Sequence, residues 1–136
     1  MAIRKVSAPQ VPEPPGGIFS NCLVVGDQVF LSGMTASGPD GRPIGGDSME
    51  GQARAVLAKI RHLVEAAGAS MGDIVKLTVY VTDIARRAEI GKARAEYFPG
   101  QKPCSTLIEV SSLVAPELLI EIDAVAIVGA AGAASA

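Results

Sequence analysis

The stretch Leu-Leu-Ile-Glu-Ile-Asp-Ala-Val-Ala-Ile-Val at residues 118–128 predicts a long β-strand that decides the fold. Successive side chains of a strand point to opposite faces of the sheet. One face receives Leu118, Ile120, Ile122, Ala124 and Ala126, and the other receives Leu119, Glu121, Asp123, Val125 and Ile127. Because both faces are largely apolar, we expect both to be buried.

Shorter patterns outside this strand predict an α+β fold in the order β-β-α-β-α-β-β, with two helices on one face of a mixed sheet. The predicted strands span residues 19–25, 28–32, 74–82, 105–111 and 118–128, and the predicted helices span residues 48–67 and 84–98. Two helices leave the second face of the sheet uncovered. Since that face is apolar, self-association is the simplest way to bury it.

Local signals mark the ends of these elements. Gly26-Asp27 predicts a hairpin turn, and Asp47 with Glu50 forms a capping box that opens the first helix. Gly68 ends that helix, and Asp83 caps the second one. In the strand at 74–82, the residues expected to share the apolar face are Val75, Leu77, Val79 and Val81.

Composition indicates one folded domain over residues 1–128. Of the 136 residues, 49% are hydrophobic and 19% charged, which excludes an intrinsically disordered chain. Residues 129–136 contain only Gly, Ala and Ser, so we expect a disordered tail there.

Charge and residue counts exclude several functions. The net charge is −2 and the aromatic share 4%, which disfavours a nucleic-acid partner. A single histidine makes a catalytic His triad or a multi-histidine metal site hard to build. Cys22 and Cys104 are expected to be free thiols. Without a leader-like segment or an apolar run of about 20 residues, we expect a cytoplasmic protein with no membrane partner.

Two places carry residues suited to chemistry. Glu121 lies between isoleucines, where desolvation would raise its pKa and fit it for proton transfer; an ion pair across the sheet is the alternative. Asp123 shares its face and could simply pair with a cation. Ser32-Gly33 could offer a hydroxyl and a closely approached backbone to a ligand, or the hydroxyl could be satisfied at the strand end.

Five segments in this order resemble the YjgF/RidA family, across residues 15–128. They are Phe30-Leu-Ser-Gly, Val64-Glu-Ala-Ala-Gly, Gly72-Asp-Ile-Val-Lys-Leu-Thr-Val-Tyr-Val-Thr-Asp, Ser105-Thr-Leu-Ile-Glu-Val-Ser-Ser-Leu and Leu119-Ile-Glu-Ile-Asp-Ala-Val-Ala. The resemblance implies a chorismate-mutase-like fold and a homotrimer with ligand clefts between subunits. It also implies hydrolysis of reactive enamines and imines, such as 2-aminoacrylate, to a carbonyl compound and ammonia, without metal or organic cofactor.

The resemblance assigns roles to single residues. Glu121 matches the catalytic glutamate that holds water, and Ser32 matches a serine of the substrate cleft. Phe19 stands where the family has a tyrosine, and Gly91 where it has an asparagine.

Two further positions differ from the family pattern. Ser105 replaces the arginine that binds the substrate carboxylate, and Leu107 replaces a cysteine, although its backbone N–H could still donate to substrate. A serine cannot supply the bidentate, charged grip of a guanidinium. We therefore expect 2-aminoacrylate to be a poor substrate. The substrate either lacks a carboxylate or uses another cation, for which Lys102 and Arg42 are candidates.

Three functions follow from this reading. The first is hydrolytic deamination of a small enamine or imine, and the second is binding of a small metabolite without turnover. The third is the ribonuclease or translation-inhibiting activity for which parts of the family are named. The acidic pI of about 5.3 and the few aromatic residues disfavour the third.

Overall fold

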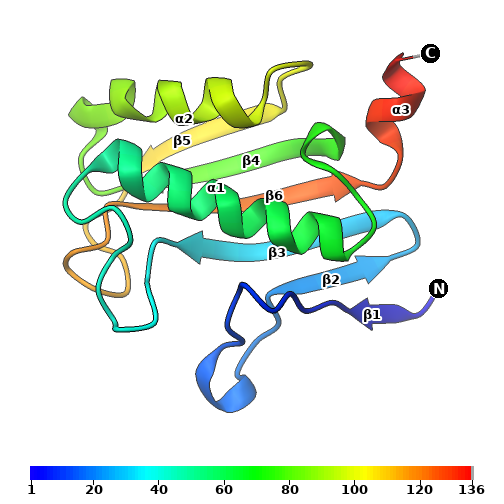
Figure 1. Cartoon of the computed structure of the whole chain (residues 1–136), viewed down its shortest axis with the longest axis horizontal. Coiled ribbons are helices and arrows are strands. Elements are labelled where there is room, and N and C mark those ends of the chain that lie inside the picture. Colours follow the sequence, from blue (N-terminus) through cyan, green and yellow to red (C-terminus); the bar gives the residue numbers. More distant parts are fainter. Residues whose placement is uncertain (136) are drawn as a thin grey trace.

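A mixed six-stranded sheet forms the body of the computed structural model, which describes residues 1–135 (Figure 1). Its strands are β1 (Ile3–Lys5), β2 (Cys22–Val25), β3 (Gln28–Thr35), β4 (Ile74–Val81), β5 (Cys104–Glu109) and β6 (Ile120–Ile127). They lie in the order β1-β2-β3-β6-β4-β5, and only β4 and β5 run parallel. The last strand in the sequence is therefore central in the sheet.

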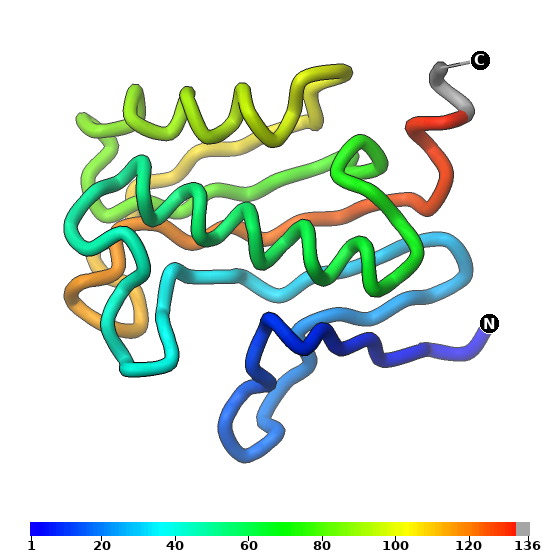
Figure 2. Tube along the Cα trace, viewed as in Figure 1, coloured from blue at the N-terminus to red at the C-terminus, as the bar shows by residue number. Residues whose placement is uncertain are grey.

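Helices α1 (Met49–Ala66) and α2 (Ile90–Tyr97) lie side by side on one face of this sheet (Figure 2). Short 3₁₀ turns precede β2, β4 and α2, at η1 (Pro15–Gly17), η2 (Met71–Asp73) and η3 (Ile84–Glu89). The prediction of an α+β fold with two helices on one face is confirmed. The structure adds β1 before the predicted elements and a short helix α3 (Ala130–Ser135) after them.

Helix α1 begins one residue later than predicted. Ser48, not Asp47, is the N-cap, and its hydroxyl accepts a hydrogen bond from the Gly51 N–H at 3.0 Å. The helix ends before Gly68, whose φ of +89° suits glycine. Its buried residues are Met49, Gln52, Ala53, Val56, Leu57, Ile60, Leu63 and Val64. All of these except Gln52 are apolar.

Strand β6 has the two predicted faces. Ile120, Ile122, Ala124 and Ala126 are buried beneath the helices. Glu121, Asp123, Val125 and Ile127 are half-buried on the opposite face, which we call the open face. Neither α1 nor α2 covers the open face (Figure 1).

Strand β4 departs from the predicted alternation at one residue. Its register against β6 shifts between Ile74 and Lys76, so Val75 is an extra residue. Ile74 enters the core, while Val75 is 37% exposed. The expectation that Val75 shares a face with Leu77 was wrong because a bulge breaks the two-residue period.

The C-terminal segment forms a helix where a disordered tail was expected. The Asp73 carboxylate accepts hydrogen bonds from the backbone N–H groups of Gly129 (3.3 Å) and Ala131 (2.8 Å), which fix the start of α3. Burial would raise the pKa of Asp73, but these bonds and those from Ser70 outweigh it and lower the pKa. Residue 136 of the predicted tail lies outside the described residues.

Gln52 joins three parts of the chain. Its side-chain amide donates to the carbonyl of Gly46 (2.7 Å) and to that of Glu117 (2.9 Å), and its oxygen accepts from the Leu119 N–H (2.8 Å). The residue is fully buried. It therefore fixes the loop before α1 and the entry to β6 relative to each other.

We predict that Gln52→Leu lowers the free energy of unfolding by about 1–3 kcal/mol, because the leucine leaves buried backbone groups without partners. Urea unfolding at fixed protein concentration measures the change. Gln101→Leu, at an exposed glutamine, is the control and should stay within about 0.5 kcal/mol of wild type. Equal stability of the two variants would contradict the assigned role of Gln52.

Candidate active site

Glu121 lies on the open face between Thr35 of β3 and Tyr80 of β4. Its side chain crosses to Gly33, where a β-carbon would collide with the Glu121 carboxylate. Gly33 stands in a bulge, since the β3–β6 register shifts between Leu31 and Met34. Glycine is needed here for space, not for a left-handed backbone.

The environment of Glu121 favours its protonated form. Burial, and secondly the Asp123 carboxylate, raise the pKa of Glu121. Among residues 1–135, the ion pairs found involve other carboxylates, so the alternative of a cross-sheet ion pair is not observed. Asp123 accepts a hydrogen bond from the Tyr80 hydroxyl at 3.2 Å instead of pairing with a cation. Burial, then Asp123 and Glu121, raise the pKa of Tyr80.

Ser32 holds the loop that carries Phe19. The Ser32 hydroxyl donates to the carbonyl of Ser20 at 2.6 Å, and its backbone N–H donates to that of Asn21 at 2.9 Å. The hydroxyl is thus satisfied at the strand end, as the alternative reading allowed. The Ser32 hydroxyl oxygen can therefore accept a hydrogen bond from a ligand but has no proton left to donate.

Phe19 and Gly33 line the same groove, which has a volume of about 540 Å³. The Phe19 side chain is 50% exposed, and residues of the proline-rich lead-in also line the groove. Gly33 therefore both borders the groove and contacts the Glu121 carboxylate. This shared residue brings Phe19, Ser32 and Glu121 into one region.

Ser105 and Leu107 lie elsewhere in the chain. Strand β5 pairs Ser105 with Leu77 and Leu107 with Val79, so their side chains share the helix-covered face of the sheet. Leu107 packs against the core, and Ser105 is exposed. Within one chain the sheet separates both residues from Glu121.

An arginine that the sequence reading did not single out contacts Ser105. Arg94 of α2 donates from Nη2 to the Ser105 Oγ at 2.9 Å. Lys102, a predicted alternative, donates from Nζ to the carbonyl of Phe98. Arg42 borders a different hollow beside Pro116. The sequence held one indication of this contact. Arg94 lies one helical turn after Gly91, so the two residues share a face of the predicted helix.

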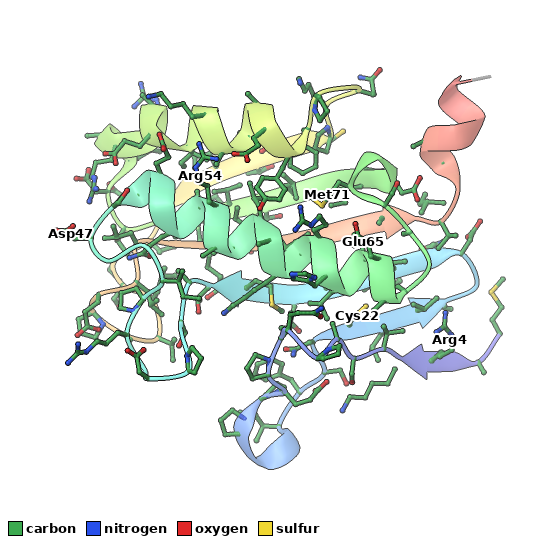
Figure 3. The ribbon with its side chains drawn as sticks, in the orientation of Figure 1. Arg4, Cys22, Asp47, Arg54, Glu65 and Met71 are labelled. Atoms are coloured by element: carbon green, nitrogen blue, oxygen red, sulfur yellow. The ribbon has the colours of Figure 1, made fainter. Side chains whose placement is uncertain are left out.

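Among residues 1–135, no cluster of three or more His, Cys, Asp or Glu side chains could hold a metal ion. The two cysteines in this range are both free, Cys22 buried and Cys104 exposed. Figure 3 shows Cys22 on the side of the sheet where β2 lies, away from α2. No helix in the same range has the length and apolar character needed to span a membrane.

The raised pKa of Glu121 predicts a pH-dependent cost to stability. Below the ordinary carboxyl value of 4.5, Glu121 is neutral in both states and costs nothing. As pH rises above 4.5, the unfolded chain ionises first, so stability falls until the folded pKa is passed. Glu121→Gln should therefore be more stable than wild type at pH 7, with the difference vanishing below pH 4.5.

Thermal unfolding of wild type and Glu121→Gln from pH 4 to 8 tests this expectation. Glu65→Gln, at an exposed glutamate of α1, is the control and should follow wild type throughout. A stability difference that is constant with pH would contradict the assignment.

Comparison with known proteins agrees with this architecture. The sequence profile of the family described as endoribonuclease L-PSP matches residues 10–128. A RutC family protein of Pyrococcus abyssi is 35% identical over 127 residues, covering 93% of this chain and 98% of its own.

Two solved structures show the same fold. A protein of unknown function from Pseudomonas aeruginosa is 44% identical, with a TM-score of 0.83 and coverage of 93% of both chains. YyfA of Yersinia pestis, described as a member of the conserved Rid family, is 29% identical with a TM-score of 0.86, covering 93% of this chain and all of its own. The chorismate-mutase-like α+β fold is confirmed, and the chain belongs to the endoribonuclease L-PSP family, also called YjgF/RidA.

Proposed function

We propose that this protein hydrolyses a small enamine or imine to a carbonyl compound and ammonia, with Glu121 as the catalytic residue. One observation carries the proposal: a half-buried carboxylate beside a groove, with a raised pKa and no ion pair among the described residues. A carboxyl group whose pKa is raised can accept a proton during the reaction and return it afterwards. A structural carboxylate at this depth would be expected to pair with a cation.

The reaction needs only water and proton transfer. An enamine first becomes the imine by gaining a proton at carbon and losing one from nitrogen. Glu121 takes a proton from water as the water oxygen bonds to the imine carbon, and that proton passes to the nitrogen, which gives a carbinolamine. Glu121 then transfers the hydroxyl proton of the carbinolamine to its nitrogen as the C–N bond breaks, and ammonia leaves while the carbonyl forms. Phe19 would pack against the substrate at the groove, and the Leu107 backbone N–H would donate to it from a neighbouring copy.

The proposed assembly is a homotrimer that buries the open face. Val125 and Ile127 are half-buried there, and Phe30 of β3 is 40% exposed on the same face. The separation of Ser105 from Glu121 within one chain also favours a cleft between subunits. A cytoplasmic location remains part of this proposal.

Binding of a metabolite without turnover is the second candidate. It is favoured by the Ser32 hydroxyl, whose proton is already donated to Ser20 and is not available to a substrate. Ribonuclease activity, named in the family description, is disfavoured because the open face presents Glu121 and Asp123, which repel phosphate.

Glu121→Gln should lower ammonia release from imines generated in solution by about 10²–10⁴-fold, because it removes the proton acceptor and keeps the shape. Release is measured over a panel of imines with the folded, assembled variant. Asp123→Asn is the matched control and should have a milder effect. Full turnover by Glu121→Gln would overturn the mechanism, and binding without any wild-type turnover would select the second candidate.

Sedimentation should give a species of three 13.9 kDa chains. Val125→Lys should shift it to smaller species, because a charge on the open face would be buried in the assembly. Val114→Lys is the control: Val114 is 87% exposed, and its substitution should leave sedimentation unchanged. A stable wild-type monomer would contradict the proposed assembly.

A further inference from the structure

Two carboxylates, Glu121 and Asp123, share the open face of β6, and both are half-buried. Residues two apart in a strand point to the same side of the sheet, so the two carboxylates are neighbours along the strand. Like charges in such a pair oppose each other's ionised form. One carboxylate therefore holds a proton more readily while the other keeps its charge, and the groups around each decide which one it is.

Tyr80 treats the two carboxylates differently. Strand β4 lies beside β6 (Figure 1), and its register places Tyr80 opposite Glu121. The Tyr80 hydroxyl nevertheless donates to the diagonal neighbour, Asp123, at 3.2 Å from Oδ2. Burial, then the Asp123 carboxylate, raise the pKa of Tyr80, so its O–H stays protonated and can donate. Among residues 1–135, no hydrogen bond to the Glu121 side chain is found, so Asp123 alone of the pair receives a donor.

The other titratable side chains on this face do not distinguish the two carboxylates. Lys76 of β4 lies opposite Val125 and is exposed, and the ion pairs found within residues 1–135 do not include it. Cys104 of β5 lies opposite Lys76, at the far edge of the sheet, and is also exposed. Strand β3, which flanks β6 on its other side, has no titratable side chain.

Two charged side chains line the adjoining groove, and both have partners of their own. Lys59 donates from Nζ to the carbonyls of Thr35 (2.7 Å) and Ser37 (2.9 Å). The Glu13 carboxylate pairs with Lys5 at 3.6 Å. Of the groups that face the carboxylate pair, the Tyr80 hydroxyl is thus the one found bonded to either member.

We propose that Tyr80 is a positioning residue that decides which of two carboxylates holds the catalytic proton, keeping the charge on Asp123 and leaving the proton to Glu121. The inference rests on the proposed deaminase function. A hydrogen bond donated to a carboxylate favours its ionised form, so Asp123 does not compete for the proton. Its retained charge in turn favours the protonated form of Glu121. Glu121 can then take a proton from water and return it during the reaction.

The pH dependence of ammonia release tests this role through Tyr80→Phe, which keeps the ring and removes the O–H. Without its donor, Asp123 takes a larger share of the proton, and Glu121 stays ionised to lower pH. The acid limb of the profile should therefore move to lower pH. Below the wild-type midpoint, release relative to its own plateau should rise roughly 2–10-fold, the effect of one lost hydrogen bond. Tyr97→Phe, at the tyrosine of α2, is the control and should keep the wild-type profile.

The effect of Tyr80 should require Asp123. Asp123→Asn removes the charge that opposes ionisation of Glu121, so it should move the acid limb to lower pH by itself. Adding Tyr80→Phe to Asp123→Asn should move the limb no further. If Tyr80→Phe instead lowers the plateau in both backgrounds and leaves the midpoint in place, its role is structural and the proposal is overturned.

A titration without substrate separates this proposal from the proposed function. The carboxyl carbon of Glu121, followed by NMR in the folded and assembled protein, should titrate at lower pH in Tyr80→Phe than in wild type. If it does so while the wild type hydrolyses no imine, the role of Tyr80 stands and the deaminase proposal fails. If the titration is unchanged while ammonia release depends on Glu121, the deaminase proposal stands and the role of Tyr80 is rejected.

Discussion

The pairing of β6 with β3 on one side and β4 on the other is the constraint on which the rest of the structure depends. It holds the last strand at the centre of the sheet and sends Ile120 and Ile122 into the core under α1. The same alternation sends Glu121 and Asp123 to the open face. A shift of one residue would bury both carboxylates, so the hydrophobic effect that packs the core also fixes where Glu121 stands.

The bulge in β3 gives the Glu121 side chain the space to reach the edge of the groove. If Ser32-Gly33 continued the regular ladder with a larger side chain at Gly33, the Glu121 carboxylate could not reach the groove edge. The extra residue also frees Ser32 to bond the Ser20 carbonyl, and that bond carries Phe19 to the groove. The β3 bulge therefore helps to position Glu121, Ser32 and Phe19, which are three of the five residues assigned to the site from the sequence.

Sequence periodicity predicted the elements whose signals are local. The hairpin at Gly26-Asp27, the apolar face of α1 and the two faces of β6 each depend on neighbouring residues alone. The bulge at Val75 and the anchoring of α3 by Asp73 depend on contacts between segments about 50 residues apart in the sequence. A pattern of neighbouring residues does not predict such contacts. Gln52 was hidden for a related reason, because a polar residue enters the core only where distant backbone groups receive it.

The same limit explains why Arg94 escaped the sequence reading. A resemblance compares residues position by position, so the serine at 105 reads as a lost cation. In three dimensions α2 runs alongside β5, and a guanidinium from the helix reaches the same strand position from outside (Figure 1). Arg94 thus brings a positive charge beside position 105 from a different element than the family pattern has it. Because Ser105 lies on the helix face and Glu121 on the open face, the proposed cleft requires the edge of one chain to meet the open face of another. The proposed trimer and the proposed active site are then one hypothesis, since the sheet separates these residues within a single chain.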